Sequence, residues 1–274
     1  MSDGSEPALN SQPRSLVFRM LVVERQRAVV VWTIDRPQAK NAVDHATLQA
    51  LVDAVAEANR DRSLRAAILT GAGETFVSGG DLRELRDKNT PEDAARFSDL
   101  GWELTRAMAA LPLPVVCAMS GPAIGGGAEL ALACDMRVAD ARAKLSFKQV
   151  RMGVTTAWGT VPRLVSLVGA GTAARLLYAA HDVSATEAKR IGLVDEVTED
   201  GHARATALAW AFDIAAASPR AVASMKRLVR ETTETARDVR TLERELFVET
   251  WSGEDHPEAV EAYFARRPAI WRDR

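Results

Sequence analysis

Hydrophobic positions near the start of the chain alternate between β-branched runs and segments with helical spacing. Two β-rich runs, Leu16–Glu24 and Ala28–Asp35, predict a hairpin. Asp44 can cap a helix that begins just after it. The apolar positions of this helix recur at helical spacing: Leu48, Leu51, Val52 and Val55. The N-terminal part of the chain therefore contains both periodicities.

The same alternation continues along the chain. Short buried strands are predicted at 66–70, 115–119, 136–139, 145–147 and 193–197. Helices are predicted at 81–85, 91–110, 128–134, 172–180 and 184–190, with another after Gly159. From Ala203 onward the pattern is helical, with breaks near 218–219, 235 and 255–257. Strands tied to helices, followed by helices alone, indicate an α/β core with a helical C-terminal region.

The composition narrows the classes of partner. The 274 residues carry 35 basic and 37 acidic side chains, a net charge of −2, so the overall charge does not attract nucleic acid or an anionic membrane. Cys117 and Cys134 lie in apolar segments, where buried free thiols are expected. No apolar run approaches the ~20 residues of a membrane span, and no secretory signal is visible. We expect a cytoplasmic protein whose first 15 residues are a disordered lead-in.

One stretch, residues 114–135, carries the strongest chemical signal. A buried strand at Val115–Met119 is broken by Gly121-Pro122, and Gly125-Gly126-Gly127 opens a helix that is apolar on every face. A helix that begins on glycines offers unpaired N–H groups to a ligand oxygen, as an oxyanion hole requires. Glu129 is the one ionisable group of this apolar helix; it is either a functional acid or a partner of the helix dipole.

A phosphate-binding interpretation of these glycines is weaker. No Lys-Ser/Thr pair follows them, and the segment from Gly125 to Leu130 lacks the last glycine of the dinucleotide motif. A second glycine-rich segment, residues 71–80, also leaves a short apolar strand. The two glycine-rich segments are therefore predicted to lie side by side.

These motifs together resemble those of the crotonase (enoyl-CoA hydratase/isomerase) superfamily. The resemblance includes Arg36-Pro37 with Asn41-Ala42, the run from Phe76 to Leu82, and the run from Ala185 to Val197, and it covers about residues 16 to 271. It implies an α/β fold, a spiral of ββα units over 16–200. It also implies a helical region over 201–274 that joins subunits into a homotrimer or a dimer of trimers.

The resemblance implies an acyl-CoA enzyme that stabilises a thioester enolate. The two amide donors would be Gly80 and Gly126, and Glu129 would exchange the proton. Coenzyme A would be part of the substrate, with no permanently bound cofactor. No metal site is predicted, because the four histidines do not form a ligand spacing. One of them, His45, is expected to face solvent.

The resemblance also implies contacts with the CoA moiety. They fall in two segments. The first contains Ala39, Lys40 and Ala42, and the second contains Ser78, Gly80, Asp81, Leu82 and Arg83. Lys40 and Arg83 are the cations placed near the phosphates, although each is equally consistent with a solvated surface position.

Two departures from the family pattern leave the reaction open. Gln149 stands where typical hydratases have a second glutamate, and an amide cannot shuttle a proton. The family's glycine-rich run Pro-Gly-Ala-Gly-Gly is altered here to Thr156-Ala157-Trp158-Gly159-Thr160, and Trp158 is expected to narrow the acyl pocket or to pack in the core. A hydratase or isomerase using Glu129 is the first interpretation. A decarboxylase of a malonyl-type acyl-CoA and a catalytically weak acyl-CoA-binding protein are the alternatives.

Overall fold

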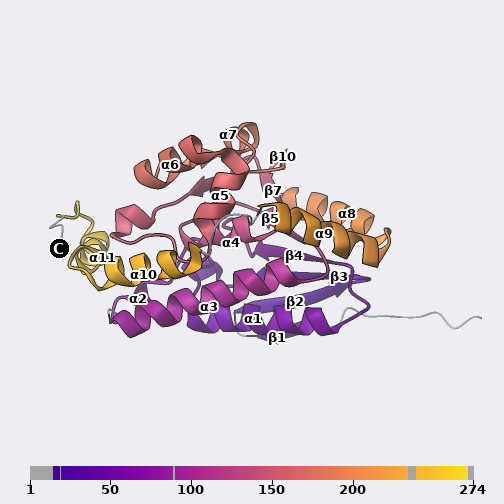
Figure 1. Cartoon of the computed structure of the whole chain (residues 1–274), viewed down its shortest axis with the longest axis horizontal. Coiled ribbons are helices and arrows are strands. Elements are labelled where there is room, and N and C mark those ends of the chain that lie inside the picture. Colours follow the sequence, from indigo (N-terminus) through magenta and orange to yellow (C-terminus); the bar gives the residue numbers. More distant parts are fainter. Residues whose placement is uncertain (1–14, 19, 89, 234–238, 271–274) are drawn as a thin grey trace, which may run out of the picture.

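A mixed sheet lies at the centre of the protein. The computed structural model describes residues 15–18, 20–88, 90–233 and 239–270 (Figure 1). In this part of the chain the large sheet has the strand order β1-β2-β3-β4-β5-β7-β10. Its strands are β1 (Ser15–Phe18), β2 (Leu21–Gln26), β3 (Val29–Ile34), β4 (Ala66–Gly71), β5 (Val115–Met119), β7 (Met136–Asp140) and β10 (Glu196–Thr198). A small sheet has the order β6-β8-β9, with β6 (Ala123–Ile124), β8 (Lys144–Ser146) and β9 (Val183–Ser184).

The helices surround this sheet on both faces and at its ends. The first group is α1 (His45–Arg60), α2 (Leu82–Leu85), α3 (Pro91–Ala110), α4 (Gly126–Ala133), α5 (Thr160–Val168) and α6 (Ala170–Ala179). The second is α7 (Ala185–Arg190), α8 (Ala203–Ala215), α9 (Pro219–Thr233), α10 (Val239–Ser252) and α11 (Asp255–Ala265). Short 3-10 turns occur at Pro37–Ala39 and Gln149–Met152. In Figure 1, α6 and α7 lie on the opposite side of the molecule from α1.

Two element predictions are corrected by the structure. The predicted strand Leu16–Glu24 is two strands, β1 and β2, which pair antiparallel with Phe18 opposite Leu21. The strand expected at 193–197 begins only at Glu196, because Leu193 and Val194 turn back and donate to the Ala188 carbonyl. The breaks expected near 218–219 and 255–257 are confirmed, since α9 begins at Pro219 and α11 begins at Asp255. The break expected near 235 lies outside the described residues.

The two faces of the sheet are buried by different helices because side chains alternate along each strand. On β3, Val29 and Val31 belong to the cluster under α8, whereas Val30, Trp32 and Ile34 belong to the main core with α1 and α3. The parallel strands β3-β4-β5-β7 are thus apolar on both faces, as expected of a sheet covered on both sides.

The main core also contains the two cysteines. Cys117 and Cys134 are buried free thiols, which confirms the sequence prediction. Burial raises the pKa of the Cys117 thiol well above its usual range, and contact with Cys134 raises it further. The helix α4 is buried from Gly127 to Ala133, as its apolar faces predicted.

The C-terminal helices return to the rest of their own chain. Figure 1 shows α10 and α11 beside α2 and α3 at one end of the molecule. Arg244 of α10 pairs with Asp99 of α3 at 2.7 Å and 3.0 Å. The buried His256 of α11 donates from Nδ1 to the Met152 carbonyl at 2.8 Å; burial lowers the pKa of this histidine, which favours the neutral ring. These contacts attach the C-terminal region to the segment that carries Gln149.

Two other expectations concern the N-terminal lead-in and membrane-spanning segments. Residues 1–14 of the predicted disordered lead-in lie outside the described residues, and Ser15 begins β1. Among the described helices, none combines the length and the apolar content that crossing a bilayer requires.

The buried carboxylate of Asp140 fixes the start of α8 on the sheet. It accepts from the amides of Gly201 and Ala203, both at 2.8 Å, and is fully buried. Replacing Asp140 with Ala leaves the buried amide of Ala203 and the more exposed amide of Gly201 without this acceptor, so we expect the free energy of unfolding to fall by about 1–3 kcal/mol in a urea titration. The control, Asp213→Ala at an exposed position of α8, should change it by less than about 0.5 kcal/mol. Equal effects of the two variants would contradict this role.

Candidate active site

The two glycine-rich segments lie side by side, as predicted. Val77 bridges Ala123, and the Ile124 amide donates to the Val77 carbonyl at 2.9 Å. A Cβ on Gly121 would lie 1.9 Å from the Glu74 carbonyl oxygen, and one on Gly127 would lie 2.1 Å from the Val77 carbonyl oxygen. Glycine is therefore required at both positions by the close approach of the two backbones.

The amides of Gly80 and Gly126 are neighbours. A Cβ on Gly126 would lie 3.8 Å from the Gly80 nitrogen, which puts the two nitrogens at most about 6 Å apart, since an amide nitrogen is ~2.5 Å from its own Cβ position. One oxygen atom can accept from two donors at this separation. Neither N–H has an acceptor within the ranges that the structure describes, whereas Asp81 N donates to Val43 O and Gly125 N to Ser146 O. Both donors can thus reach a ligand oxygen.

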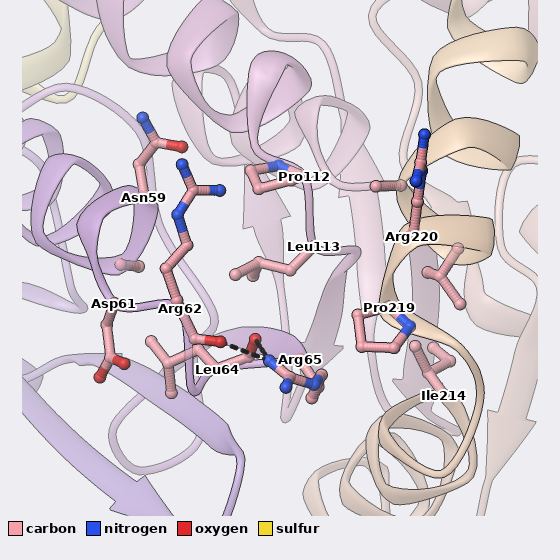
Figure 2. A pocket seen from close by; sticks show the side chains of 13 residues that line it. Asn59, Asp61, Arg62, Leu64, Arg65, Pro112, Leu113, Ile214, Pro219 and Arg220 are labelled. Carbon is pink, nitrogen blue, oxygen red and sulfur yellow. Dashed lines mark hydrogen bonds between the residues drawn. The ribbon is translucent and has the colours of Figure 1, made fainter.

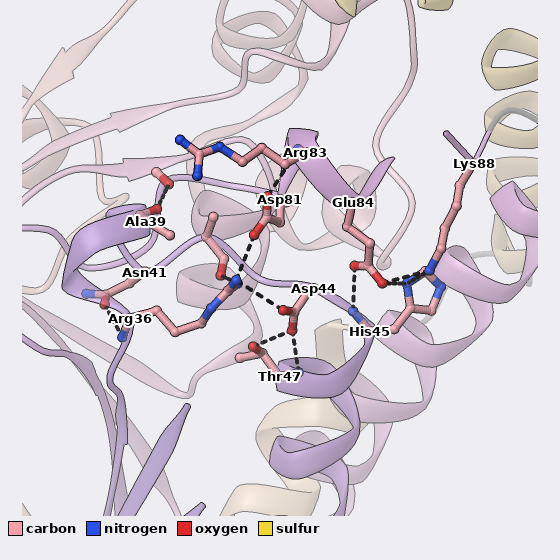
Figure 3. A network of polar contacts seen from close by, with 12 residues as sticks. Arg36, Ala39, Asn41, Asp44, His45, Thr47, Asp81, Arg83, Glu84 and Lys88 are labelled. Carbon is pink, nitrogen blue, oxygen red and sulfur yellow. Dashed lines mark hydrogen bonds and ion pairs between the residues drawn. The ribbon is translucent and has the colours of Figure 1, made fainter. Parts of the chain in front are cut away.

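The predicted CoA-contact segments are joined by Arg36. Its guanidinium contacts Asp81 at 2.7 Å and Asp44 at 3.1 Å, and it donates to the Ala42 carbonyl (Figure 3). Asp81 also caps α2 by accepting from the Arg83 amide. The carboxylate of Asp81 is thus held by the protein itself. The sequence pattern did not predict this role of Arg36.

The backbone of these segments is also paired. Ser78 N donates to Lys40 O at 3.2 Å, and Ser78 Oγ donates to Ala39 O at 3.4 Å. Asn41 adopts a positive φ of 55° and is fully buried; its amide donates to the carbonyls at 72 and 75. Lys40 and Arg83 are exposed, and Leu82 is half-buried. The structure thus brings the two predicted segments together, with their cations toward solvent.

His45 does not face solvent freely, which corrects the sequence prediction. Its side chain is 25% exposed, its Nδ1 lies 3.2 Å from Glu84 Oε1, and its ring packs on Phe97. Burial alone would raise the pKa of Glu84, but hydrogen bonds from Lys88 and His45 outweigh it and lower the pKa. The spacing of residues along α1 could not show this, because Glu84 comes from α2.

Glu129 is buried and its carboxylate is held by donors from one segment. Oε2 accepts from the amides of Ala157 at 3.1 Å and Trp158 at 3.0 Å, and from the Thr160 hydroxyl. Oε1 accepts from Gln149 Nε2 at 2.8 Å. A carboxyl group that is only 4% exposed needs such donors, because they replace the water that it has lost. Thr160 is a residue of the site that sequence reasoning missed, although it stands in the altered glycine-rich run.

Gln149 leaves one polar atom without a partner. Because Glu129 Oε1 accepts, the amide of Gln149 must present its NH₂ group there and its Oε1 elsewhere. This Gln149 Oε1 is buried and accepts no hydrogen bond from any residue that the structure describes. A buried acceptor of this kind marks a place where a water or a ligand can donate.

Trp158 packs directly against Gly126. A Cβ on Gly126 would lie 2.9 Å from Cζ3 and Cη2 of the indole, and a Cβ on Gly101 of α3 would lie 1.9 Å from its Nε1. Trp158 is 1% exposed. The prediction of core packing and the prediction of a residue beside the acyl pocket are therefore compatible: the ring is buried between α3 and the first residue of α4.

A cavity elsewhere in the protein contains none of these residues. It has a volume of about 300 Å³ and lies between the end of α1, the residues before β5, and the α8–α9 connection (Figure 2). Arg62, Arg65 and Arg220 are among its lining residues. In the described residues, no three His, Cys, Asp or Glu side chains gather as a metal site would require.

Comparison with known proteins gives consistent matches over nearly the whole chain. A family model described as enoyl-CoA hydratase/isomerase matches residues 24–274. A short-chain-enoyl-CoA hydratase of Clostridium acetobutylicum is 37% identical, covering 90% of this chain and 95% of its own. A crotonyl-CoA hydratase of Syntrophomonas wolfei is 34% identical, covering 93% and 98%.

Solved structures agree with the sequence matches. The crystal structure of a carnitinyl-CoA hydratase from Mycobacterium avium is 31% identical, has a TM-score of 0.84, and covers 94% of this chain and all of its own. A similarity of this size over the whole chain confirms the predicted crotonase-like α/β fold.

The packing of Trp158 predicts that Gly101→Ala destabilises the protein, although alanine favours a helix more than glycine does. Gly101→Ala improves helix propensity by up to ~1 kcal/mol but collides with the indole, so we expect a net loss of about 1–3 kcal/mol in the free energy of unfolding. In the Trp158→Ala background the same substitution should stabilise the protein, because the obstacle is gone. The measurement is a double-mutant cycle by urea titration.

Gly171→Ala in α6 is the matched control for this cycle. No atom lies within 4 Å of the Cβ position at Gly171. This variant should be neutral or stabilising in both backgrounds. If Gly101→Ala behaved like Gly171→Ala with Trp158 present, the indole would not occupy the position described.

Proposed function

The chain belongs to the enoyl-CoA hydratase/isomerase family, and from this premise we propose that it hydrates or isomerises an enoyl-CoA thioester with Glu129 as the acid/base. The observation that supports the proposal is that the Gly80 and Gly126 amides are neighbours and that Glu129 lies in the first turn of the helix that Gly126 begins. The two amides would hold a carbonyl oxygen and Glu129 would exchange a proton beside it.

The two amides would act as the oxyanion hole. When a nucleophile adds to the β-carbon of an enoyl thioester, an electron pair moves onto the carbonyl oxygen and an enolate forms. Two fixed N–H donors stabilise that negative charge more than they stabilise the neutral carbonyl, and one such donor is typically worth about 3 kcal/mol in the transition state. The glycines at 80 and 126 have no side chain that obstructs this approach.

One carboxylate is sufficient for the proton balance. In hydration, Glu129 accepts a proton from water while the water oxygen bonds to the β-carbon, and the same carboxyl then returns the proton to the α-carbon. Gln149 Oε1, a buried acceptor without a protein partner among the described residues, would accept the second hydrogen of the water and orient it. In isomerisation, Glu129 would remove a proton from one carbon and return it to another.

The CoA moiety would lie along the segments joined by Arg36. The exposed Lys40 and Arg83 are the cations that we assign to its phosphates. The main chain around Ala39 and Ala42 would contact the adenine side, and Ser78 would belong to the second contact segment. Coenzyme A would enter as part of the substrate, with no permanent cofactor.

We further propose that the protein works in the cytoplasm, in fatty-acid metabolism, as a homotrimer or a dimer of trimers. The region 201–274 would supply the subunit contacts. Three exposed apolar side chains on α9 support this: Met225, Leu228 and Val229 are each more than half exposed.

A second candidate reaction is decarboxylation of a malonyl-type thioester, and Gln149 is the observation that favours it. Loss of CO₂ leaves its bonding electron pair on the α-carbon and forms the enolate without a base, so the reaction depends on the two amides more than on a second carboxylate. A single proton donor then completes it.

The substrates can be separated directly. We expect crotonyl-CoA to be hydrated by the purified protein, measured by loss of the enoyl absorbance, with no CO₂ released from methyl- or ethylmalonyl-CoA. CO₂ release without hydration would establish the second candidate in its place. Binding of all these thioesters without turnover would exclude both reactions and indicate an acyl-CoA-binding protein.

Glu129→Gln tests the proton-transfer role. The amide keeps the shape of the side chain but cannot shuttle a proton, so kcat should fall by about 10²–10⁴-fold while KM changes little. Glu57→Gln, at an exposed position of α1, is the matched control and should leave both constants unchanged. Full activity of Glu129→Gln would show that another group carries the proton.

Thr160→Val tests the positioning of that carboxylate. The substitution removes one donor to Oε2, so the carboxyl should lose its fixed orientation. We expect kcat to fall about 10-fold or more with a small change in KM. Thr160→Ser keeps the hydroxyl and should restore kcat; an identical loss in the two variants would indicate a packing role only.

A further inference from the structure

We infer that Phe97 and Trp158 form an aromatic wall across both glycine-rich segments, and that this wall restricts the enzyme to short acyl chains. The inference rests on the proposed function, because the acyl group is located by the two amides and Glu129. It adds the class of substrate: a short enoyl-CoA is accepted, and a medium-chain one is excluded by two named rings.

Each amide donor has one ring of the wall against it. The indole of Trp158 lies 2.9 Å from the Cβ position of Gly126, and Phe97 Cζ lies 3.4 Å from the Cβ position of Gly80. The two rings contact each other, with centroids 5.3 Å apart and planes inclined at 52°. A thioester whose oxygen accepts from both amides would therefore lie close to these two rings.

The backbone of Trp158 fixes the ring relative to the reacting carbons. Its N–H donates to Glu129 Oε2 at 3.0 Å, and its carbonyl accepts from Thr105 Oγ1 at 3.2 Å and from Arg163 at 2.6 Å. The residue that holds the acid/base thus also carries the ring that touches Gly126. An acyl chain that extends past the reacting carbons on this side must displace the indole.

The wall is packed from behind, so displacement is costly. Phe97 is 6% exposed and Trp158 1%. Trp251 of α10 contacts Phe97 at 5.9 Å between centroids, and Phe247 contacts Trp251 at 5.2 Å. Trp251 is itself held, since its Nε1 donates to the Lys88 carbonyl at 2.9 Å. The rings cannot swing aside without moving α10, and close packing of this kind resists extra methylene groups.

The experiment compares kcat/KM for the 2-enoyl thioesters crotonyl-, hexenoyl-, octenoyl- and decenoyl-CoA. For the wild type we expect crotonyl-CoA to exceed decenoyl-CoA by at least about 10-fold, the effect of poorly accommodated methylenes in a closed pocket. Trp158→Ala should raise the decenoyl-to-crotonyl ratio by about 10-fold or more. Trp158→Phe, which removes less of the ring, should raise it by a smaller factor and guards against loss of folding in the alanine variant.

Trp32→Phe is the matched control, because Trp32 is fully buried in β3 and makes no contact with this wall in the ring pairs of the described residues. It should leave the ratio unchanged. Equal wild-type activity on all four thioesters would overturn the inference. An unchanged ratio in folded Trp158→Ala and Trp158→Phe would also overturn it.

Binding separates this inference from the proposed reaction. The affinities of the saturated thioesters butyryl- and decanoyl-CoA can be measured by calorimetry without any turnover. Tighter binding of butyryl-CoA, reversed or abolished by Trp158→Ala, supports the wall even if no enoyl-CoA reacts. Equal affinity of the wild type for both would reject the wall while leaving a hydratase activity intact.

Discussion

The burial of the Glu129 carboxylate is the constraint from which the rest of the site follows. An ionised carboxyl at 4% exposure is stable only where donors replace the water it has lost. The segment from Ala157 to Thr160 supplies three of them to one oxygen, and Gln149 supplies one to the other. The segment must therefore lie against α4, and its irregular backbone places its N–H groups and hydroxyl toward the Glu129 carboxyl group.

The same segment accounts for the departures from the family pattern. The resemblance places a glycine where Thr160 stands and an alanine where Trp158 stands. In this chain the threonine contributes a hydroxyl to Glu129, and the tryptophan contributes an amide to Glu129 and a ring to the space beside Gly126. The two changed residues, Trp158 and Thr160, thus act together on the Glu129 carboxylate and on the space beside Gly126.

The close approach of the backbones is a second constraint, because it leaves no space for a Cβ atom and so requires glycine. Gly121 and Gly127 allow the two glycine-rich segments to meet, and Gly101 admits the indole into the side of α3. A glycine inside a helix is unfavourable by about 1 kcal/mol, so its presence in α3 is explained by the ring that fills its place. The C-terminal helices then complete the packing, since Trp251 supports Phe97 and His256 holds the segment before Gly153.

The elements themselves were largely predictable, because periodicity and caps are local properties. The cap at Asp44, the short apolar strands and the buried helix after Gly125 all follow from nearby residues. The errors fall where the local pattern gives no signal. One is the reversal between Phe18 and Leu21, where apolar character continues through two strands, and the other is Leu193 and Val194, which are apolar but turn back before β10.

By itself the sequence determined the fold class, the family resemblance and the candidate residues Gly80, Gly126, Glu129 and Gln149. Only the tertiary structure decided which groups meet. It decided that Arg36 joins the two predicted CoA segments, that His45 contacts Glu84, that Thr160 donates to Glu129, and that Gln149 keeps a buried acceptor without a partner in the described residues. The physical reason is that these contacts join residues from 20 to 45 positions apart, whose proximity depends on how whole elements pack and leaves no periodic trace along the chain.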